Sequence, residues 1–165
     1  MDERMIKAVF LDRDGTINKS APEHGYIKKW SEFEFLPEAV DAIKLLNDKG
    51  IKAIVITNQQ GIGKKLMTLD DLSEIHANMQ EELGKQNALI DAFYFCPHLK
   101  EENCSCRKPK PGMLLKAAED FGLEMSECIF IGDNERDIEA ANAAGCKSIK
   151  IDKDGSLLKA VKSII

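Results

Sequence analysis

The chain has 165 residues, of which 44% are hydrophobic, 31% are charged and 6% are aromatic. This length and balance predict one folded domain spanning residues 1–165, and they exclude a disordered or fibrous protein. The net charge of −5 argues against a general nucleic-acid binder, because neutralising phosphates requires an excess of Lys and Arg.

The chain also lacks the apolar segments that direct proteins to membranes. No apolar run approaches the ~18 residues of a membrane helix, and the charged start has no apolar stretch like that of a secretory signal. We therefore expect a cytoplasmic protein. We also expect a monomer that binds a small phosphorylated metabolite rather than nucleic acid or a membrane.

Short apolar runs alternate with helical patterns along the chain. Strands are predicted at residues 6–11, 52–57, 92–95, 128–131 and 148–151, because these runs are rich in β-branched or aromatic side chains. Helices are predicted at residues 37–49, 68–83, 111–121 and 134–144. This alternation predicts an α/β fold, a three-layer sandwich around a central parallel, Rossmann-like sheet.

Two carboxylates follow the first predicted strand. In open α/β sheets the active site lies beyond the carboxyl ends of the strands. Asp12 and Asp14 are separated by one residue, and Gly15 permits a turn that would point both into a common space. Two close carboxylates repel one another unless a cation joins them or one binds a proton. The plainer alternative is a polar turn, since Asp and Gly are common turn residues.

Further polar groups follow the second and fourth strands. Thr57 and Asn58 precede a Gly-rich turn, which could form a phosphate cradle with freed backbone N–H groups. Asp133 follows the fourth strand, with Asp137 one helical turn later, although an Asp at a helix start is often only a cap. Lys108 lies in a basic run whose two prolines are expected to hold the backbone extended.

Taken together, these groups predict a site for a divalent cation and a phosphoryl group. Oxygen ligands at strand ends suit Mg²⁺, which takes its remaining ligands from water and substrate phosphate. Phosphate monoesters hydrolyse extremely slowly without catalysis. A nucleophilic carboxylate would split this reaction into two easier displacements.

Four segments in order resemble the motifs of haloacid-dehalogenase-like phosphatases: FLDRDGTIN, TNQQGIG, the Lys of RKPKPGM, and GDNERD. The resemblance covers most of the chain. It implies that Asp12 is the nucleophile that forms an aspartyl-phosphate. It implies that Asp14 protonates the leaving oxygen and then activates water.

The same resemblance implies how the phosphate and the metal are held. Thr57 and Lys108 would hold the phosphoryl group. Mg²⁺ would be bound by Asp12, Asp133 and the backbone carbonyl of Asp14.

Three of the five cysteines crowd into eleven residues together with a histidine. The predicted zinc ligands are Cys96, His98, Cys104 and Cys106. Three thiolates and an imidazole form a recognised closed, tetrahedral site for structural Zn²⁺. The alternative is a set of reduced thiols beside an exposed histidine. Cys128 and Cys146 are expected to pack in the core, and His76 is expected to be a partly buried structural residue.

The cysteine loop leads directly into RKP, an arrangement that resembles two related groups. These are the D-glycero-D-manno-heptose 1,7-bisphosphate phosphatases and the histidinol-phosphate phosphatases. Residues 24–27 and 108–113 are more similar to the heptose enzymes, whereas the short spacer within the cysteine loop is more similar to the histidinol enzymes. Asn134 stands where a basic residue is common in both groups. A heptose bisphosphate is the first candidate substrate, and histidinol phosphate is the alternative.

The interval from Asp14 to Thr57 is too short for a cap domain. The walls available for substrate selection are then the cysteine loop, Arg107 and residues 24–30. We expect Asn58 and Arg107 to bind substrate, with the planar fork of Arg107 gripping a second phosphate or another anionic group.

Two other classes fit less well. A phosphate-accepting receiver domain shares the parallel sheet, the acidic pocket and a Lys-Pro pair, but its acceptor Asp should follow a later strand. A zinc-based nucleic-acid module would explain the basic run at 107–110, but the acidic total and the scarcity of aromatics oppose it.

Overall fold

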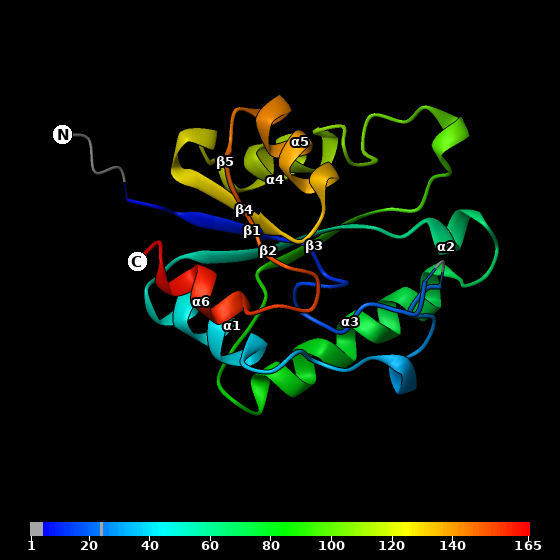
Figure 1. Cartoon of the computed structure of the whole chain (residues 1–165), viewed down its shortest axis with the longest axis horizontal. Coiled ribbons are helices and arrows are strands. Elements are labelled where there is room, and N and C mark those ends of the chain that lie inside the picture. The colour runs from blue at the N-terminus through cyan, green and yellow to red at the C-terminus, as the bar shows by residue number, and fades with distance from the viewer. Residues whose placement is uncertain (1–4, 24) are drawn as a thin grey trace.

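Five strands form the centre of the molecule. A computed structural model describes residues 5–23 and 25–165, and its strands form one sheet in the order β3-β2-β1-β4-β5 (Figure 1). The strands are β1 (Ala8–Leu11), β2 (Lys52–Asn58), β3 (Ala92–Cys96), β4 (Cys128–Gly132) and β5 (Lys147–Lys150). Neighbouring strands are all parallel, which confirms the expected α/β fold.

Helices and short turns connect these strands. The helices are α1 (Ala39–Asp48), α2 (Gln60–Gly63), α3 (Leu69–Gly84), α4 (Gly112–Phe121), α5 (Glu135–Ala144) and α6 (Leu157–Lys162). Short 3-10 turns lie at η1 (Trp30–Glu32), η2 (Lys100–Glu102) and η3 (Met125–Glu127). The four predicted helices are present, whereas α2, α6 and the 3-10 turns were not predicted.

Helices cover both faces of the sheet and so complete three layers. In Figure 1, α4 and α5 lie above the sheet, and α1, α3 and α6 lie below it. Val9 and Leu11 of β1 belong to the buried cluster on the α1 side, whereas Ala8 and Phe10 belong to the cluster beneath α4 and α5. A strand buried on both faces needs no polar alternation, which explains the continuous apolar runs.

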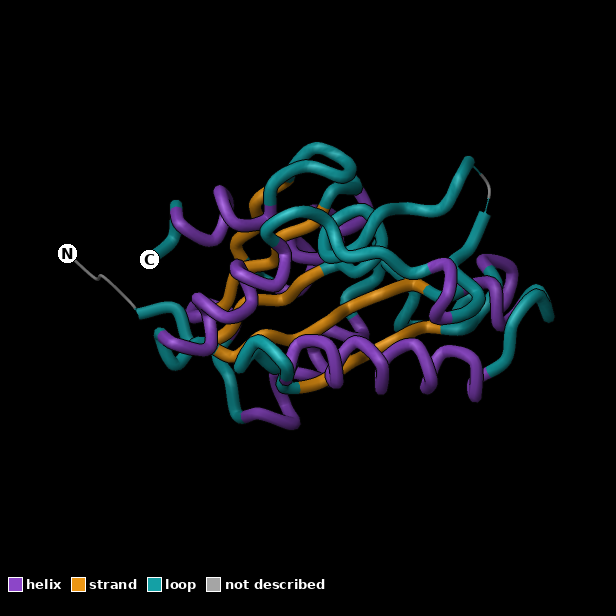
Figure 2. Tube along the Cα trace, turned by 90° about the horizontal axis from the view of Figure 1, so that it is seen from below, coloured by secondary structure: helices purple, strands orange, loops and turns teal. Residues whose placement is uncertain are grey.

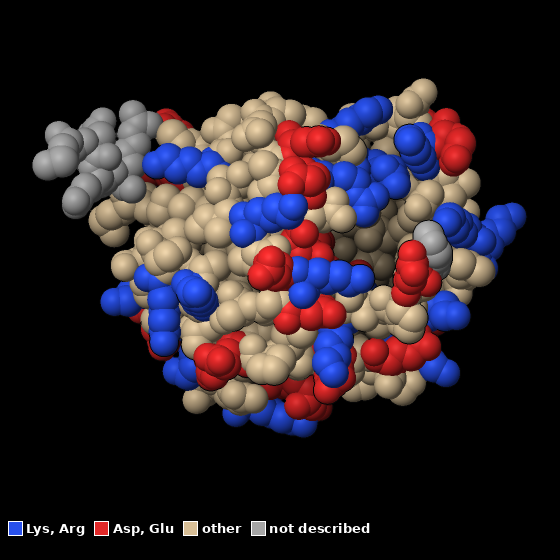
Figure 3. All heavy atoms as spheres, in the orientation of Figure 1, with Lys and Arg blue, Asp and Glu red and all other residues tan. Residues whose placement is uncertain are grey.

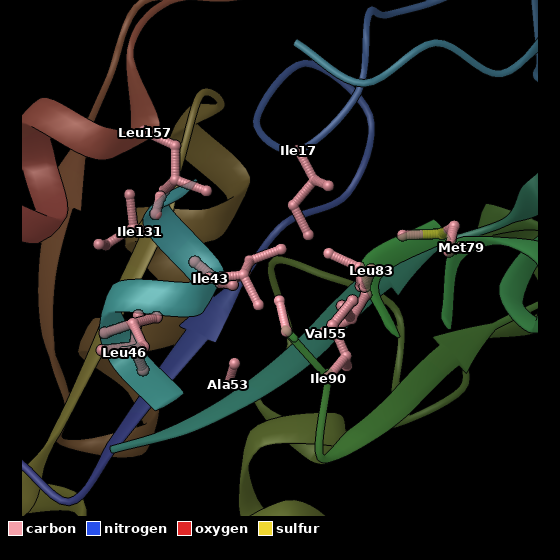
Figure 4. Close-up of a cluster of buried hydrophobic side chains, with 14 of the residues drawn as sticks. Ile17, Ile43, Leu46, Ala53, Val55, Met79, Leu83, Ile90, Ile131 and Leu157 are labelled. Carbon is pink, nitrogen blue, oxygen red and sulfur yellow. The ribbon is translucent and has the colours of Figure 1, made fainter. Parts of the chain in front are cut away.

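The larger apolar cluster lies between the sheet and α1, α3 and α6. Figure 4 shows Ile43 of α1, Val55 of β2 and Leu83 of α3 within it, and all three side chains are fully buried. Full burial of one such side chain contributes about 1.5–3 kcal/mol. The cluster therefore holds β1 and β2 firmly, and with them the residues that follow these strands.

Two helices begin with reciprocal side-chain caps. At α3, the Thr68 hydroxyl accepts from the Asp71 N–H at 3.1 Å, and the Asp71 carboxylate accepts from the Thr68 N–H at 2.8 Å. At α5, the Asn134 side chain accepts from the Arg136 N–H at 3.0 Å, and Asp137 accepts from the Asn134 N–H at 3.2 Å. These caps satisfy N–H groups that have no partner within the helix.

The carboxyl ends of the strands open toward loops. Between β1 and β2, the described residues hold only η1 and α1, so no cap domain is present there. Figure 2 shows the loops gathered beyond this end of the strands. No helix in the described ranges combines the length and the apolar character that crossing a membrane requires.

Candidate active site

A cavity of about 180 Å³ lies where β1, β2 and β4 end. Its acidic lining residues are Asp12, Asp14, Asp133 and Asp137. The remaining lining residues are Gly25, Tyr26, Thr57, Asn58, Lys108, Asn134 and Arg136. The fold therefore brings together residues from strand ends, loops and the first turn of α5 that are up to 125 positions apart, from Asp12 to Asp137. Figure 3 shows a hollow on one face of the molecule, bordered by acidic and basic side chains.

Lys108 is the buried cation of this cavity. Its Nζ lies 2.9 Å from Oδ1 of Asp12, 2.6 Å from Oδ1 of Asp137 and 3.1 Å from the carbonyl of Ile56. Burial disfavours the charged amine, but the two carboxylates outweigh this effect and raise the pKa of Lys108. Lys108 is therefore positively charged beside Asp12, where a phosphoryl group would carry negative charge.

Asp133 approaches the β1 loop closely. The Thr16 hydroxyl donates to its Oδ1 at 3.2 Å. Gly15 has a φ of +88°, and a Cβ at this position would overlap the Asp133 carboxylate. Glycine is thus needed at position 15 for two reasons: it adopts the left-handed backbone conformation of the turn, and its missing side chain leaves room for the Asp133 carboxylate.

Three carboxylates share one small region. Oxygens of Asp12, Asp133 and Asp137 lie within 4.8 Å of one another. Burial and the charge of Asp12 raise the pKa of Asp133 to about 7. The same two causes raise the pKa of Asp137 to about 6, although Lys108 opposes them. Three carboxylates this close together are a set of oxygen donors that fits a hard divalent cation such as Mg²⁺.

Asp14 lines the cavity but its carboxylate lies in a different network. Its Oδ1 accepts from Arg13 Nε at 3.0 Å, from Arg13 Nη2 at 2.9 Å and from Asn18 Nδ2 at 2.9 Å. Its Oδ2 accepts from Gln59 Nε2 at 3.2 Å. Burial alone would raise the pKa of Asp14, but Arg13 and these hydrogen bonds lower it. Binding of Mg²⁺ by the carbonyl of Asp14 stays a prediction.

Thr57 and Asn58 both reach the cavity. The buried Thr57 hydroxyl accepts from Gln59 Nε2 at 2.9 Å. The Asn58 side chain pairs with the backbone of Lys108, donating to its carbonyl at 3.2 Å and accepting from its N–H at 3.0 Å. Asn58 therefore fixes the backbone that carries the lysine, and its expected role in substrate binding stays a prediction.

The backbone around Lys108 differs from the expected extended conformation. The Lys108–Pro109 peptide bond is cis, and the Lys110 N–H donates to the Arg107 carbonyl at 2.8 Å. The expectation of an extended run was wrong because this hydrogen bond closes a tight turn. The turn, held by Asn58, aims Lys108 into the cavity.

Arg107 is not among the residues that line this cavity. It lies beside a neighbouring hollow of about 220 Å³, together with Lys100, Cys104 and Lys110. Its Nη1 donates to the Lys108 carbonyl at 3.4 Å, and its buried Nε has no hydrogen-bond partner among the described residues. The structure thus groups Arg107 with other basic residues of the cysteine loop, and its grip on a substrate anion stays a prediction.

Several residues of this region were missed in the sequence. Arg136 lines the cavity two positions after Asn134, and its Nε lies 3.3 Å from Oδ1 of Asn134. The capping role of Asn134 was the available signal, because residues just inside a helix N-terminus face the strand ends. Arg13 was also missed: its side chain is fully buried and contacts His76.

His76 is a buried residue, as expected. Its Nε2 lies 3.2 Å from Nη1 of Arg13, and its ring stacks on Phe93 at 4.1 Å between centroids. Burial, with a further contribution from the charge of Arg13, lowers the pKa of His76 to about 3. Among the expected substrate-facing residues 24–30, Gly25 and Tyr26 line the cavity, whereas His24 lies outside the described residues.

The predicted zinc ligands converge in the loop after β3. Ligand atoms of Cys96, His98, Cys104 and Cys106 all lie within 4.8 Å of one another. His98 Nδ1 lies 3.4 Å from the Cys96 sulfur and 3.2 Å from the Cys106 sulfur. With Zn–S bonds of about 2.3 Å, tetrahedral ligands lie roughly 3.8 Å apart, so this set fits a zinc ion. No cysteine forms a disulfide, and Cys128 and Cys146 are buried in the core.

A family model described as haloacid dehalogenase-like hydrolase matches residues 18–145. The chain belongs to this family. The match includes Thr57, Lys108, Asp133 and the cysteine loop, and Asp12 precedes it. Membership excludes the receiver-domain alternative.

Curated relatives and solved structures agree with this assignment. The D-glycero-beta-D-manno-heptose-1,7-bisphosphate 7-phosphatase of Neisseria meningitidis is 38% identical over 142 residues, covering 86% of this chain and 75% of the relative. The corresponding alpha-heptose enzyme of Mycobacterium tuberculosis is 40% identical over 149 residues, covering 87% of this chain and 78% of that enzyme. The crystal structure of D,D-heptose 1,7-bisphosphate phosphatase from B. bronchiseptica, complexed with magnesium and phosphate, has a TM-score of 0.85 at 30% identity. The match covers 95% of the present chain and 86% of the B. bronchiseptica chain. This haloacid dehalogenase-like protein is therefore a phosphatase.

Proposed function

We propose that this phosphatase removes the 7-phosphate of D-glycero-D-manno-heptose 1,7-bisphosphate in a Mg²⁺-dependent reaction. The observation that carries the proposal is the position of Lys108 between Asp12 and Asp137, beside Asp133, at the ends of β1 and β4. The choice of substrate follows the relatives from Neisseria meningitidis and Mycobacterium tuberculosis, whose names specify heptose bisphosphates of opposite anomeric configuration.

In the proposed first step, a carboxylate oxygen of Asp12 attacks phosphorus. The P–O bond to the sugar breaks as an aspartyl-phosphate forms. Asp14 gives a proton to the leaving sugar oxygen. Lys108, with Thr57, would balance the charge that develops on the phosphoryl oxygens.

In the second step, Asp14 takes a proton from water as the water oxygen attacks phosphorus. The bond from phosphorus to Asp12 breaks, which releases inorganic phosphate and restores both carboxyl groups. Asp14 thereby regains the proton that it gave to the leaving oxygen, so the two steps together leave its protonation state unchanged. The same residue thus serves as acid in the first step and as base in the second.

Two metal ions fit the described residues. Asp12 and Asp133, with the carbonyl of Asp14, would hold Mg²⁺, while Asp137 would anchor Lys108 beside it. The ion would supply a positive charge against the phosphoryl oxygens and lower the barrier to attack. Cys96, His98, Cys104 and Cys106 would hold a structural Zn²⁺.

A phosphate-release panel in Mg²⁺ tests the proposal. It contains both anomers of heptose 1,7-bisphosphate, histidinol phosphate and common sugar monophosphates. We expect kcat/KM to be at least about tenfold higher for one heptose bisphosphate than for histidinol phosphate, a difference of about 1.4 kcal/mol. A preference for histidinol phosphate would select the alternative substrate. If no compound released phosphate above background, the proposal of a phosphatase of this class would be rejected.

A further inference from the structure

Arg13 is an unusual residue for the interior of this protein. Its side chain is 0% exposed. In the sequence, Arg13 stands between Asp12 and Asp14. An isolated buried cation is strongly unfavourable, so a buried Arg needs well-placed partners. Its partners are Asp14, which accepts hydrogen bonds from Nε and Nη2 of Arg13, and His76, which contacts Nη1.

The hydrogen bond from the Arg13 guanidinium determines the protonation state of the His76 ring. Arginine has N–H donors and no acceptor. His76 Nε2, at 3.2 Å from Arg13 Nη1, must therefore accept the hydrogen bond, which requires a neutral ring with its proton on Nδ1. The lowered pKa of His76 agrees with this state.

Aromatic rings hold this contact from both sides. Phe93 of β3 stacks on the His76 ring with an interplanar angle of 15°. Phe33 covers the guanidinium, with the Arg13 Cζ 5.9 Å from its ring centroid. The imidazole and the guanidinium are thus confined by packing, so the direction of the Arg13 fork is fixed by elements outside the β1 loop.

The two carboxylate oxygens of Asp14 differ in the number of hydrogen bonds that they accept. Oδ1 accepts three hydrogen bonds, two from Arg13 and one from Asn18. Oδ2 accepts one, from Gln59. The crowded oxygen has no room for a proton, so Oδ2 is the oxygen that can carry and deliver one.

We propose that His76 is a positioning residue that acts through Arg13 to hold the Asp14 carboxylate with Oδ2 toward the leaving group. This inference rests on the proposed function, in which Asp14 protonates the leaving oxygen. His76 acts at a distance and does not touch the substrate. Without its acceptor, the Arg13 fork loses one of its fixed contacts and Asp14 no longer presents one defined oxygen.

The reactivity of the leaving group separates positioning from a merely structural role. A sugar alkoxide needs a proton as it leaves, whereas p-nitrophenolate leaves readily without one. Correct placement of a general acid contributes roughly 10²–10⁴-fold to rate. Damage to Asp14 should therefore reduce hydrolysis of a heptose bisphosphate far more than that of p-nitrophenyl phosphate.

The test measures kcat/KM for both substrates, in Mg²⁺, with four variants. His76→Leu removes the acceptor, and His76→Gln restores an acceptor oxygen near the position of Nε2. Asp14→Asn reports the full loss of the acid. Met79→Ala, on the same buried face of α3, weakens packing without touching Arg13.

We expect His76→Leu to lower kcat/KM for the heptose bisphosphate at least about tenfold more than for p-nitrophenyl phosphate, in the direction shown by Asp14→Asn. His76→Gln should recover most of the loss, and Met79→Ala should affect both substrates equally. If His76→Leu does not fold, His76→Asn takes its place, because the Asn side chain is too short for its oxygen to reach Arg13.

Equal losses for both substrates in the acceptor-free variant would overturn the inference. So would a His76→Gln variant as impaired as His76→Leu. Either result leaves the proposed function standing, because the wild-type protein would still hydrolyse the heptose bisphosphate. A wild-type protein without that activity would overturn both proposals.

Discussion

At the scale of single residues, the cavity needs the space that Gly15 leaves beside Asp133. Gly15→Ala should nearly abolish phosphate release, because its Cβ would overlap Asp133. It should also lose about 1–2 kcal/mol of stability from the left-handed backbone.

Gly50→Ala is the matched control, since Gly50 has a φ of +72° and, its chain neighbours aside, no atom of the described residues lies within 4 Å of its added Cβ. It should lose similar stability and keep full activity. Urea unfolding and phosphate release, measured on both variants, check the prediction. Equal activities would show that Asp133 does not depend on the space at Gly15.

His76 should also make the stability of the protein depend on pH. Its pKa is lowered to about 3 in the folded protein, mainly by burial, and lies near 6.5 in the unfolded chain. Below about pH 6.5 the unfolded chain takes up a proton that the folded protein refuses. The contribution of this group is therefore favourable above that pH and is lost as the pH falls toward 3.

The comparison of wild type with His76→Gln isolates this effect. The free energy of unfolding of the wild type should fall, relative to the variant, by about 1.4 kcal/mol for each pH unit below 6.5. Urea unfolding at pH 7.5 and pH 5.0 measures it. A constant difference between the two proteins would contradict a buried neutral histidine.

At the scale of elements, the cap of α5 links stability to the active cavity. Asn134→Ala should cost about 1 kcal/mol by removing the side chain that accepts from the Arg136 N–H. It should also lower activity, because Asp137 and Arg136 of this first turn both line the cavity.

Thr68→Ala removes the matching cap of α3, and Thr68 is not a lining residue of the cavity. Its loss of stability should be similar, and its kcat/KM should be unchanged. Thermal unfolding and phosphate release of the two variants provide the comparison. If the two variants were equally active, α5 would position nothing that the reaction needs.

The cysteine loop is the second element whose structure can be tested. Cys104→Ser should lose zinc and unfold at a lower temperature, because few apolar side chains hold this loop together. Cys146→Ala removes a core thiol and should keep about one zinc per chain. Metal analysis and thermal unfolding check both. Zinc retained by Cys104→Ser, or absent from the wild type, would contradict the proposed site.

At the scale of the whole molecule, the parallel sheet and most of the site could be predicted from sequence. Strand–helix alternation and the apolar runs gave the layers, and the polar residues after each strand gave Asp12, Thr57 and Asp133. The contact of Arg13 with His76 could not be predicted, because His76 lies on α3 and the rule that strand ends meet says nothing of where a helix side chain points. The tight turn at Lys108 was missed because Asn58 at the end of β2, and not the two prolines, holds its backbone.

The central claim is that Asp12 carries the phosphoryl group between the two steps. Asp14→Asn, which lacks the base for the second step, should accumulate this intermediate when mixed with p-nitrophenyl phosphate and Mg²⁺. Rapid acid quenching followed by peptide mass mapping should place one phosphoryl group on Asp12. A phosphoryl group on another residue, or an Asp12→Asn variant with full activity, would contradict the account.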